Sequence, residues 1–259
     1  MPQSHAARSP RSRVPPFRFS LGNSAPCVRL EAMSSADKPL LVLAHGSLAT
    51  GAHMERVGAA VADLVDVVAP DLPGHATRSA EPYSLPESVA VMEEIIDAAG
   101  ERPVLLGGHS LGGFTALTCA ARRPERPAGL LLMGCAVEPR GAGAVAYQAA
   151  GRLYDAFGAR WNRVRRLPHN PLAPVWGQVI STCGSHQLAE LDCPVLILGG
   201  ALDQLHLGAR QFARATPNSR VVTARGRSHA WPNLRPDEVG AQIRHWLLTD
   251  VLREPTLIE

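Results

Sequence analysis

A serine flanked by glycines constrains this chain more than any other stretch. The sequence Gly108-His109-Ser110-Leu111-Gly112 follows the apolar run 103–106 and precedes the helix-prone run 114–121. This strand–turn–helix context is typical of a nucleophile elbow, a sharp turn that lifts a serine hydroxyl above the end of a sheet. The serine at the tip takes a strained backbone conformation, and its neighbours two positions away approach so closely that both need glycine. The alternative is a glycine-rich strand–helix turn with an incidental serine.

Short apolar runs alternate with amphipathic helical patterns along the rest of the chain. The expected strands are 39–44, 65–69, 103–106, 128–133, 194–200 and 220–224. The expected helices are 52–64, 85–99, 114–121, 207–215 and 236–251. This alternation predicts the α/β class, with a mostly parallel, doubly wound sheet of about six core strands and helices on both faces. Ligands of such sheets bind outside the carboxyl ends of the strands.

Two segments of the chain lack this alternation of strand and helix patterns, and they set the predicted domain boundaries. Residues 1–37 are rich in proline, serine and arginine and lack a hydrophobic period, so we expect a disordered tail. Residues 136–190 contain no strand pattern, but Val145, Ala149, Leu153 and Phe157 recur every four residues and predict a helix. A second helix is expected near 175–182. The predicted organisation is a core of residues 38–135 and 191–255 with a small helical cap inserted at 136–190.

The tail has several open interpretations. It lacks the apolar segment of a secretory signal, and its arginine and serine bias leaves a transit peptide as an alternative. Translation that begins at Met33 would place residues 1–32 outside the native protein. Residues 14–19 could instead add an edge strand to the sheet.

Composition excludes several classes of function. Among 259 residues the net charge is +3, yet residues 1–32 hold five arginines and one acid, so the rest carries about −1. The chain after residue 32 therefore lacks the net positive charge that would indicate a nucleic-acid partner. No apolar run reaches the roughly 18 residues of a membrane span. The sequence holds no signal for the oligomeric state.

Five cysteines bear on compartment and metal binding. Cys27, Cys119, Cys135, Cys183 and Cys193 show neither CxxC spacing nor a Cys/His ligand pattern, and no histidine pair has metal-ligand spacing. We expect no metal, and buried reduced thiols in a cytoplasmic protein. The alternative is a disulfide between Cys183 and Cys193.

A serine nucleophile needs a base, and the base needs an orienting acid. His229 follows the last expected strand, and Asp203 follows the strand before it. The order Ser110, Asp203, His229 is the order of an elbow-type hydrolase. Glu138, just past another strand, is the rival acid, whereas Asp192 precedes its strand and lies at the wrong end.

Attack on a carbonyl group requires backbone N–H groups that face the developing oxyanion. We expect one from Leu111, at the start of a helix, where the helix dipole is favourable. The second is expected from Ser47 in the loop that follows the first strand, with Leu48 as the alternative.

The remaining candidates concern a pocket and the other histidines. His45 is expected to fix its loop by hydrogen bonding, and His75 to be structural. The predicted pocket residues are Leu48, His109, Leu153, Phe157, Trp176 and Trp231. His109 has the alternative of packing beside the nucleophile.

These motifs together resemble a known family. The stretches His45-Gly46-Ser47, 71–75, 108–113, 194–203 and Ser228-His229 are similar to the α/β-hydrolase fold superfamily, in its short-cap serine esterase-like branch. The resemblance covers residues 39–250. Members often carry two further strands before the His-Gly loop, which this chain lacks outside its tail. Serine at position 110 argues against the dehalogenases and epoxide hydrolases, which use aspartate there, and Lys38 is badly placed for the pocket lysine of hydroxynitrile lyases.

The sequence therefore predicts a carboxylesterase-like serine hydrolase. Its expected substrate is a small carboxylic ester, thioester or lactone, cleaved without a cofactor through an acyl-enzyme. Two alternatives use the same residues: a slow-turnover ligand sensor that signals to a partner, and a cofactor-free perhydrolase or carbon–carbon hydrolase.

Overall fold

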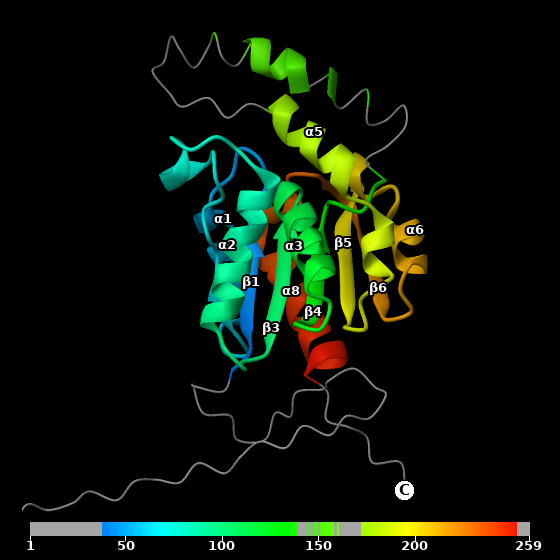
Figure 1. Cartoon of the computed structure of the whole chain (residues 1–259). Helices are drawn as coiled ribbons and strands as arrows, with labels where there is room; N and C mark the ends of the chain where they lie inside the picture. Colours follow the sequence, from blue (N-terminus) through cyan, green and yellow to red (C-terminus); the bar gives the residue numbers. More distant parts are fainter. Residues whose placement is uncertain are drawn as a thin grey trace, which may run out of the picture.

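A six-stranded parallel sheet forms the centre of the protein, in the order β2-β1-β3-β4-β5-β6 (Figure 1). The computed structural model describes residues 38–138 and 172–252, together with 145, 148, 149, 151–157 and 160. The strands are β1 (Leu40–Ala44), β2 (Asp66–Val68), β3 (Val104–His109), β4 (Pro127–Met133), β5 (Val195–Leu202) and β6 (Ser219–Ser228). All five neighbouring pairs are parallel, which confirms the predicted α/β class and the doubly wound sheet.

The strand sequences are continuous apolar runs because helices cover both faces of the sheet. Every residue of β1, β3 and β4 is buried. The edge strands β2 and β6 are only partly buried. The best-buried part of the sheet is therefore formed by the strands β1, β3 and β4.

Helices cover the sheet in two layers, one in front of it and one behind it in Figure 1. Residues of α2, α3, α5 and α6 pack in one hydrophobic cluster, and those of α1 and α8 in the other. The helices are α1 (Gly51–Gly58), α2 (Leu85–Ala98), α3 (Leu111–Arg122), α5 (Leu172–Thr182), α6 (Ala209–Arg214), α7 (Trp231–Leu234) and α8 (Pro236–Trp246). Short 3-10 turns follow α1 and β5 at Ala59–Val61 and Gln204–His206.

Local signals explain where helices begin. The Ser84 side chain accepts a hydrogen bond from the Glu87 backbone N–H, and Pro86 lies in the first turn of α2, where its missing N–H costs nothing. The expected helix over 85–99 is thus confirmed. The helix expected over 52–64 instead ends at Gly58 and continues as a 3-10 turn.

Strand β6 is longer than its apolar run predicts. It reaches Ser228, whereas the sequence indicated an end near Ala224. A register shift between Gly200 and Leu202 lets the ladder with β5 continue, so that Leu202 pairs with Ser228. The bulge explains the difference, because it carries both strands further toward the edge at which ligands bind.

Helix α5 lies above the carboxyl ends of the strands (Figure 1). Its Val175 and Trp176 are buried, and the Trp176 ring meets Phe114 of α3 edge to face, with centroids 6.1 Å apart. Asp155 accepts hydrogen bonds from the first two backbone N–H groups of α5, at 2.7 and 2.9 Å. Residues 151–157 are helical, as expected. The tail 1–37 and much of 136–190 lie outside the described residues, so the domain boundaries stay predictions.

The cysteines in the described part are free thiols. Cys119, Cys135, Cys183 and Cys193 are all buried and unpaired by disulfides, so the alternative of a Cys183–Cys193 disulfide is wrong. Cys27 lies outside the described residues.

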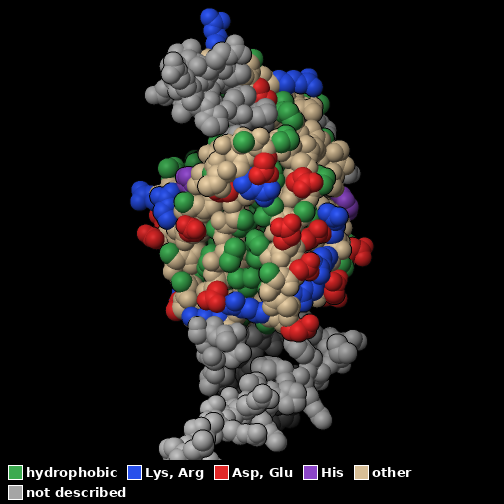
Figure 2. Space-filling model, turned by 60° about the vertical axis from the view of Figure 1, so that its left-hand side comes forward, with side chains coloured by type: hydrophobic (Ala, Val, Ile, Leu, Met, Phe, Trp, Pro, Cys, Tyr) green, Lys and Arg blue, Asp and Glu red, His purple; other side chains and the backbone are tan. Residues whose placement is uncertain are grey.

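The surface in view carries charges of both signs. Figure 2 turns forward the side of the molecule where α1 and α2 lie, and shows acidic and basic side chains interspersed around hydrophobic ones. Among the residues that the structure describes, no helix has the length and apolar character that a membrane span requires.

The turn between β3 and α3 has the strained form that its sequence predicts. Ser110 has φ +53° and ψ −116°, a left-handed backbone conformation that is uncommon for a non-glycine residue. A Cβ on Gly108 would lie 2.3 Å from the Gly112 carbonyl carbon, and one on Gly112 would lie 2.1 Å from the Ala44 carbonyl oxygen. Backbone atoms block both positions, so both glycines are required for this turn.

Replacement of Gly112 by alanine tests this packing. We expect Gly112→Ala to lower the free energy of unfolding by at least about 2 kcal/mol, because the new methyl group meets backbone that cannot move aside. The matched control is Gly177→Ala in α5, where the added Cβ would have only an ordinary contact, 3.7 Å from Gln148. Chemical denaturation measures both. A Gly112→Ala protein as stable as the control would contradict the packing described.

Candidate active site

The predicted catalytic residues follow the carboxyl ends of three strands of the sheet, β3, β5 and β6. Ser110 stands between β3 and α3, Asp203 follows β5, and His229 follows β6. The pairing of Leu202 with Ser228 places the next residue of each strand, Asp203 and His229, side by side. The extension of β6 thus accounts for the meeting of the acid with the base.

A continuous hydrogen-bonded chain joins these side chains. The Ser110 Oγ lies 3.0 Å from His229 Nε2, and His229 Nδ1 lies 3.0 Å from both carboxylate oxygens of Asp203. A carboxylate only accepts, so Nδ1 carries the ring proton and donates it to Asp203. Nε2 is then the acceptor of the Ser110 hydroxyl. The base therefore has the tautomer that proton removal from serine requires.

Asp203 is buried yet retains its charge. Burial raises the pKa of its carboxyl group, but the hydrogen bond and the charge attraction of His229, with the Leu205 N–H at 2.8 Å, outweigh burial and hold that pKa below its ordinary value. A carboxylate is thus available to stabilise a positive charge on His229.

Gly134 is a site residue that the sequence analysis missed. It has φ +56°, and a Cβ there would lie 2.7 Å from Asp203 Oδ2 and 3.1 Å from His229 Nδ1. The end of β4 therefore packs directly against the acid–base pair. A glycine immediately after a buried strand was the only signal available.

The structure places the rival acid elsewhere. Glu138 Oε1 accepts a hydrogen bond from the Ser185 backbone N–H at 2.9 Å, which ties the segment after β4 to the turn after α5. It is Asp203, not Glu138, that meets His229.

The loop after β1 reaches the nucleophile. A Cβ on Gly46 would lie 3.2 Å from the Ser110 Cβ. The Gly46 carbonyl oxygen accepts from His45 Nδ1 at 2.8 Å and from the Ala49 N–H at 3.2 Å. Because that carbonyl shares a planar trans peptide with the Ser47 N–H, these two bonds also set the direction of the predicted oxyanion donor.

His45 links this loop to the next one. Its Nε2 accepts the Leu72 N–H at 3.1 Å while its Nδ1–H holds Gly46, so the expectation that His45 fixes the loop is confirmed. Its ring centroid lies 5.1 Å from that of His75, which is also buried. Burial lowers the pKa of His45 to about 4, so the ring stays neutral.

Leu111, the other predicted donor, is the first residue of α3. An N–H in that position has no acceptor within its own helix and lies at the positive end of the helix dipole. The first turn is buried directly beneath Ser110. Its role as an oxyanion donor remains a prediction.

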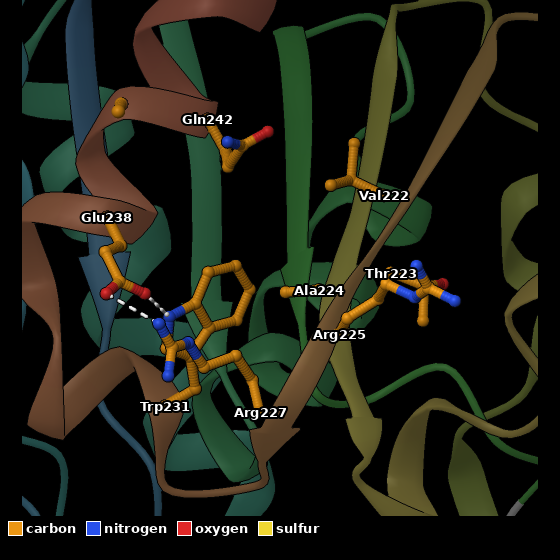
Figure 3. Close-up of a pocket in the computed structure, with 9 residues that line it drawn as sticks. Val222, Thr223, Ala224, Arg225, Arg227, Trp231, Glu238 and Gln242 are labelled. Atoms are coloured by element: carbon orange, nitrogen blue, oxygen red, sulfur yellow. Dashed lines mark hydrogen bonds and ion pairs between the residues drawn. The ribbon is translucent and has the colours of Figure 1, made fainter.

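The predicted pocket residues are distributed unevenly. Trp176 packs in the layer of α3 and α5, whereas Trp231 packs in the layer of α1 and α8. There the Trp231 indole N–H donates a hydrogen bond to Glu238 at 2.9 Å. The Trp231 side chain also lines a pocket of about 520 Å³ beside β6, together with Arg227 and Gln242 (Figure 3). This placement differs from the prediction that both indoles wall one pocket, because the Trp231 N–H has a carboxylate partner in α8.

The other pocket candidates differ in exposure. Leu48, Leu153 and Phe157 are 55%, 60% and 69% exposed, and Leu48 has φ +62°. His109 is buried. Contact of the three exposed side chains with an acyl group stays a prediction.

Metal-ligating side chains do not cluster in the part of the chain that the structure describes. It contains no group of three or more histidine, cysteine, aspartate or glutamate side chains suited to a metal ion.

Comparison with known proteins points to one family. A model of the Alpha/beta hydrolase family matches residues 41–242. Lipase LipV of Mycobacterium tuberculosis is 38% identical over 74 residues, which are 28% of this chain and 28% of that protein. The pimeloyl-[acyl-carrier protein] methyl ester esterase of Neisseria meningitidis serogroup A is 27% identical over 227 residues, with 73% of this chain and 70% of that protein covered.

A solved structure shares the fold. The chain superimposes on a thermophilic esterase from Thermogutta terrifontis with a TM-score of 0.62 and 22% sequence identity, over 81% of this chain and 89% of that one.

Stability should depend on pH through the buried histidines. Burial lowers the pKa of His45 to about 4 and that of His109 to about 3, so below about pH 6.5 the unfolded chain binds protons that the folded protein excludes. We expect the free energy of unfolding to fall as the pH drops from about 6.5 to 4, with His45 alone contributing on the order of 3 kcal/mol.

Denaturation curves between pH 4 and 8 measure this slope. His45→Gln should reduce the slope of the free energy of unfolding against pH. His245→Gln, which removes an exposed histidine, should leave that slope unchanged. Equal slopes for wild type and His45→Gln would contradict the account of a buried neutral ring.

Proposed function

Because the chain belongs to the alpha/beta hydrolase family, we propose that it hydrolyses a small carboxylic ester, thioester or lactone through an acyl-enzyme on Ser110. The observation that carries the proposal is the hydrogen-bonded chain from Ser110 Oγ through His229 to Asp203. A serine hydroxyl is a weak nucleophile, and an adjacent base of the correct tautomer overcomes that weakness.

Acylation begins with proton transfer. As Ser110 Oγ forms its bond to the carbonyl carbon, its proton passes to His229 Nε2 and the carbonyl electron pair moves to oxygen. Asp203, a charged group at 3.0 Å, stabilises the imidazolium that results. In this proposal the backbone N–H groups of Ser47 and Leu111 donate hydrogen bonds to the oxyanion.

The tetrahedral intermediate then collapses. The carbon–oxygen or carbon–sulfur bond to the leaving group breaks, and the Nε2 proton of His229 passes to that group. Water repeats the sequence: His229 takes its proton, the hydroxide adds to the acyl carbon, and the bond to Ser110 Oγ breaks as the proton returns to the serine. These steps need no external oxidant or reductant.

Ester substrates are supported by the relatives, which are named as a lipase and as a methyl ester esterase. A cap over 136–190 fits the position of α5 above the carboxyl ends of the strands. Four buried free thiols fit a reducing compartment such as the cytoplasm.

Loss of the nucleophile tests the reaction class. Ser110→Ala should lower kcat for a p-nitrophenyl ester series by on the order of 10⁶-fold, because only water remains to attack. A fluorophosphonate probe should label wild type and fail to label the variant. Wild-type turnover no faster than that of Ser110→Ala would contradict the proposal and favour a ligand-binding role.

The choice of acid has its own test. Asp203→Asn should lower kcat by on the order of 10⁴-fold, since the amide no longer holds the His229 tautomer or stabilises its charge. Glu138→Gln makes the same chemical change at the rival acid and keeps a carbonyl oxygen for the Ser185 N–H, so activity should stay near that of wild type. Steady-state kinetics of both variants decide, and the reverse ranking would contradict the assignment.

A further inference from the structure

His109 makes contacts that its predicted position in a substrate pocket does not explain. It ends β3 and is buried beside the nucleophile. Its Nε2 lies 2.9 Å from the His229 carbonyl oxygen, and the two rings are tilted against each other with centroids 4.8 Å apart. The residue before the serine therefore contacts the residue that activates it.

The hydrogen bond defines the protonation of the ring. A carbonyl oxygen only accepts, so His109 Nε2 carries the proton and donates it to His229. Nδ1 is then an unprotonated nitrogen, buried and without a hydrogen-bond partner among the described residues. It faces Gly46, where a Cβ would lie 3.1 Å away. The His109 ring thus lies between the loop that contains His229 and the loop that contains Gly46 and the predicted oxyanion donor.

The His229 carbonyl needs such a partner. The ladder of β6 ends at Ser228, and α7 begins only at Trp231, so residue 229 lies between two regular elements. Its flanks are tied to α8, since Arg227 and Trp231 both donate to Glu238. The hydrogen bond from His109 ties the backbone of residue 229 to the end of β3, whereas the bond to Ser110 is made by its side chain.

The electrical neutrality of His109 matters as well. Burial, together with repulsion from His229, lowers the pKa of His109 to about 3. A neutral ring donates its hydrogen bond without opposing the positive charge that forms on His229 during acylation.

We infer that His109 is a positioning residue: its Nε2–H holds the His229 backbone so that the imidazole stays at hydrogen-bond distance from Ser110. The inference rests on the proposed function, in which that distance sets the rate of acylation. Displacement of a catalytic group by about 1 Å can cost on the order of 10²-fold in rate. The contact joins two groups of the protein rather than protein and substrate, so we expect the effect to fall on kcat rather than on KM.

Two replacements separate the donor from the bulk of the ring. His109→Phe keeps a ring and removes the donor, and we expect kcat and the rate of fluorophosphonate labelling to fall about 10- to 100-fold, with KM little changed. His109→Gln keeps an N–H at a similar reach and should retain most of the activity. If the phenylalanine variant does not fold, His109→Leu replaces it. Thermal unfolding of each variant and titration of active sites correct for any loss of folded protein.

A substrate-independent readout separates this inference from the proposed function. The His229 Nδ1 proton, hydrogen-bonded to buried Asp203, gives a low-field proton NMR resonance that should shift or broaden in His109→Phe and persist in His109→Gln. Absence of wild-type turnover overturns the proposed function, and the resonance still tests the position of His229. Wild-type kcat and an unchanged resonance in His109→Phe overturn the inference, as does an equal loss in His109→Gln.

Discussion

The backbone of Ser110 is held in a conformation that costs a non-glycine residue on the order of 1–3 kcal/mol. Its N–H donates to the Met133 carbonyl at 2.8 Å, and its own carbonyl accepts from Phe114 at 3.1 Å, so β4 and α3 hold it from two sides. Gly112, pressed against the Ala44 carbonyl, closes the turn from the side of β1. Two strands, β1 and β4, and the helix α3 thus hold Ser110 in its strained conformation. Its hydroxyl group projects at the edge of the sheet where the strands end.

The loops around that residue are joined by groups that burial keeps uncharged. His45 connects the loop after β1 to Leu72, and His109 lies between that loop and the carbonyl of His229. Asp203 is the exception: it keeps its charge because His229 and a backbone N–H compensate for its burial. His229 therefore lies between a charged carboxylate and the Ser110 hydroxyl.

Much of this arrangement could be predicted from the chain, for reasons that particular residues show. Parallel strands end at one edge, so the sequence predicts that Ser110, Asp203 and His229, each after an expected strand, lie at that edge. The contacts of Gly134, Glu138 and Trp231 could not be predicted in the same way. Each depends on a partner in another element, and no local spacing records which strand end, helix terminus or carboxylate that partner is. The bulge that brings Leu202 to Ser228 is also such a contact, since it belongs to the pairing of two strands.

The proposed reaction requires that the strained Ser110 accept an acyl group. The most direct measurement is mass spectrometry of the protein after rapid acid quench of its reaction with an ester of a bulky, slowly hydrolysed acid. We expect a mass increase equal to one acyl group, which peptide mapping locates on Ser110 and which disappears at the rate of turnover. Turnover without any acylated Ser110, or an acyl group that accumulates on another residue at the rate of turnover, would contradict it.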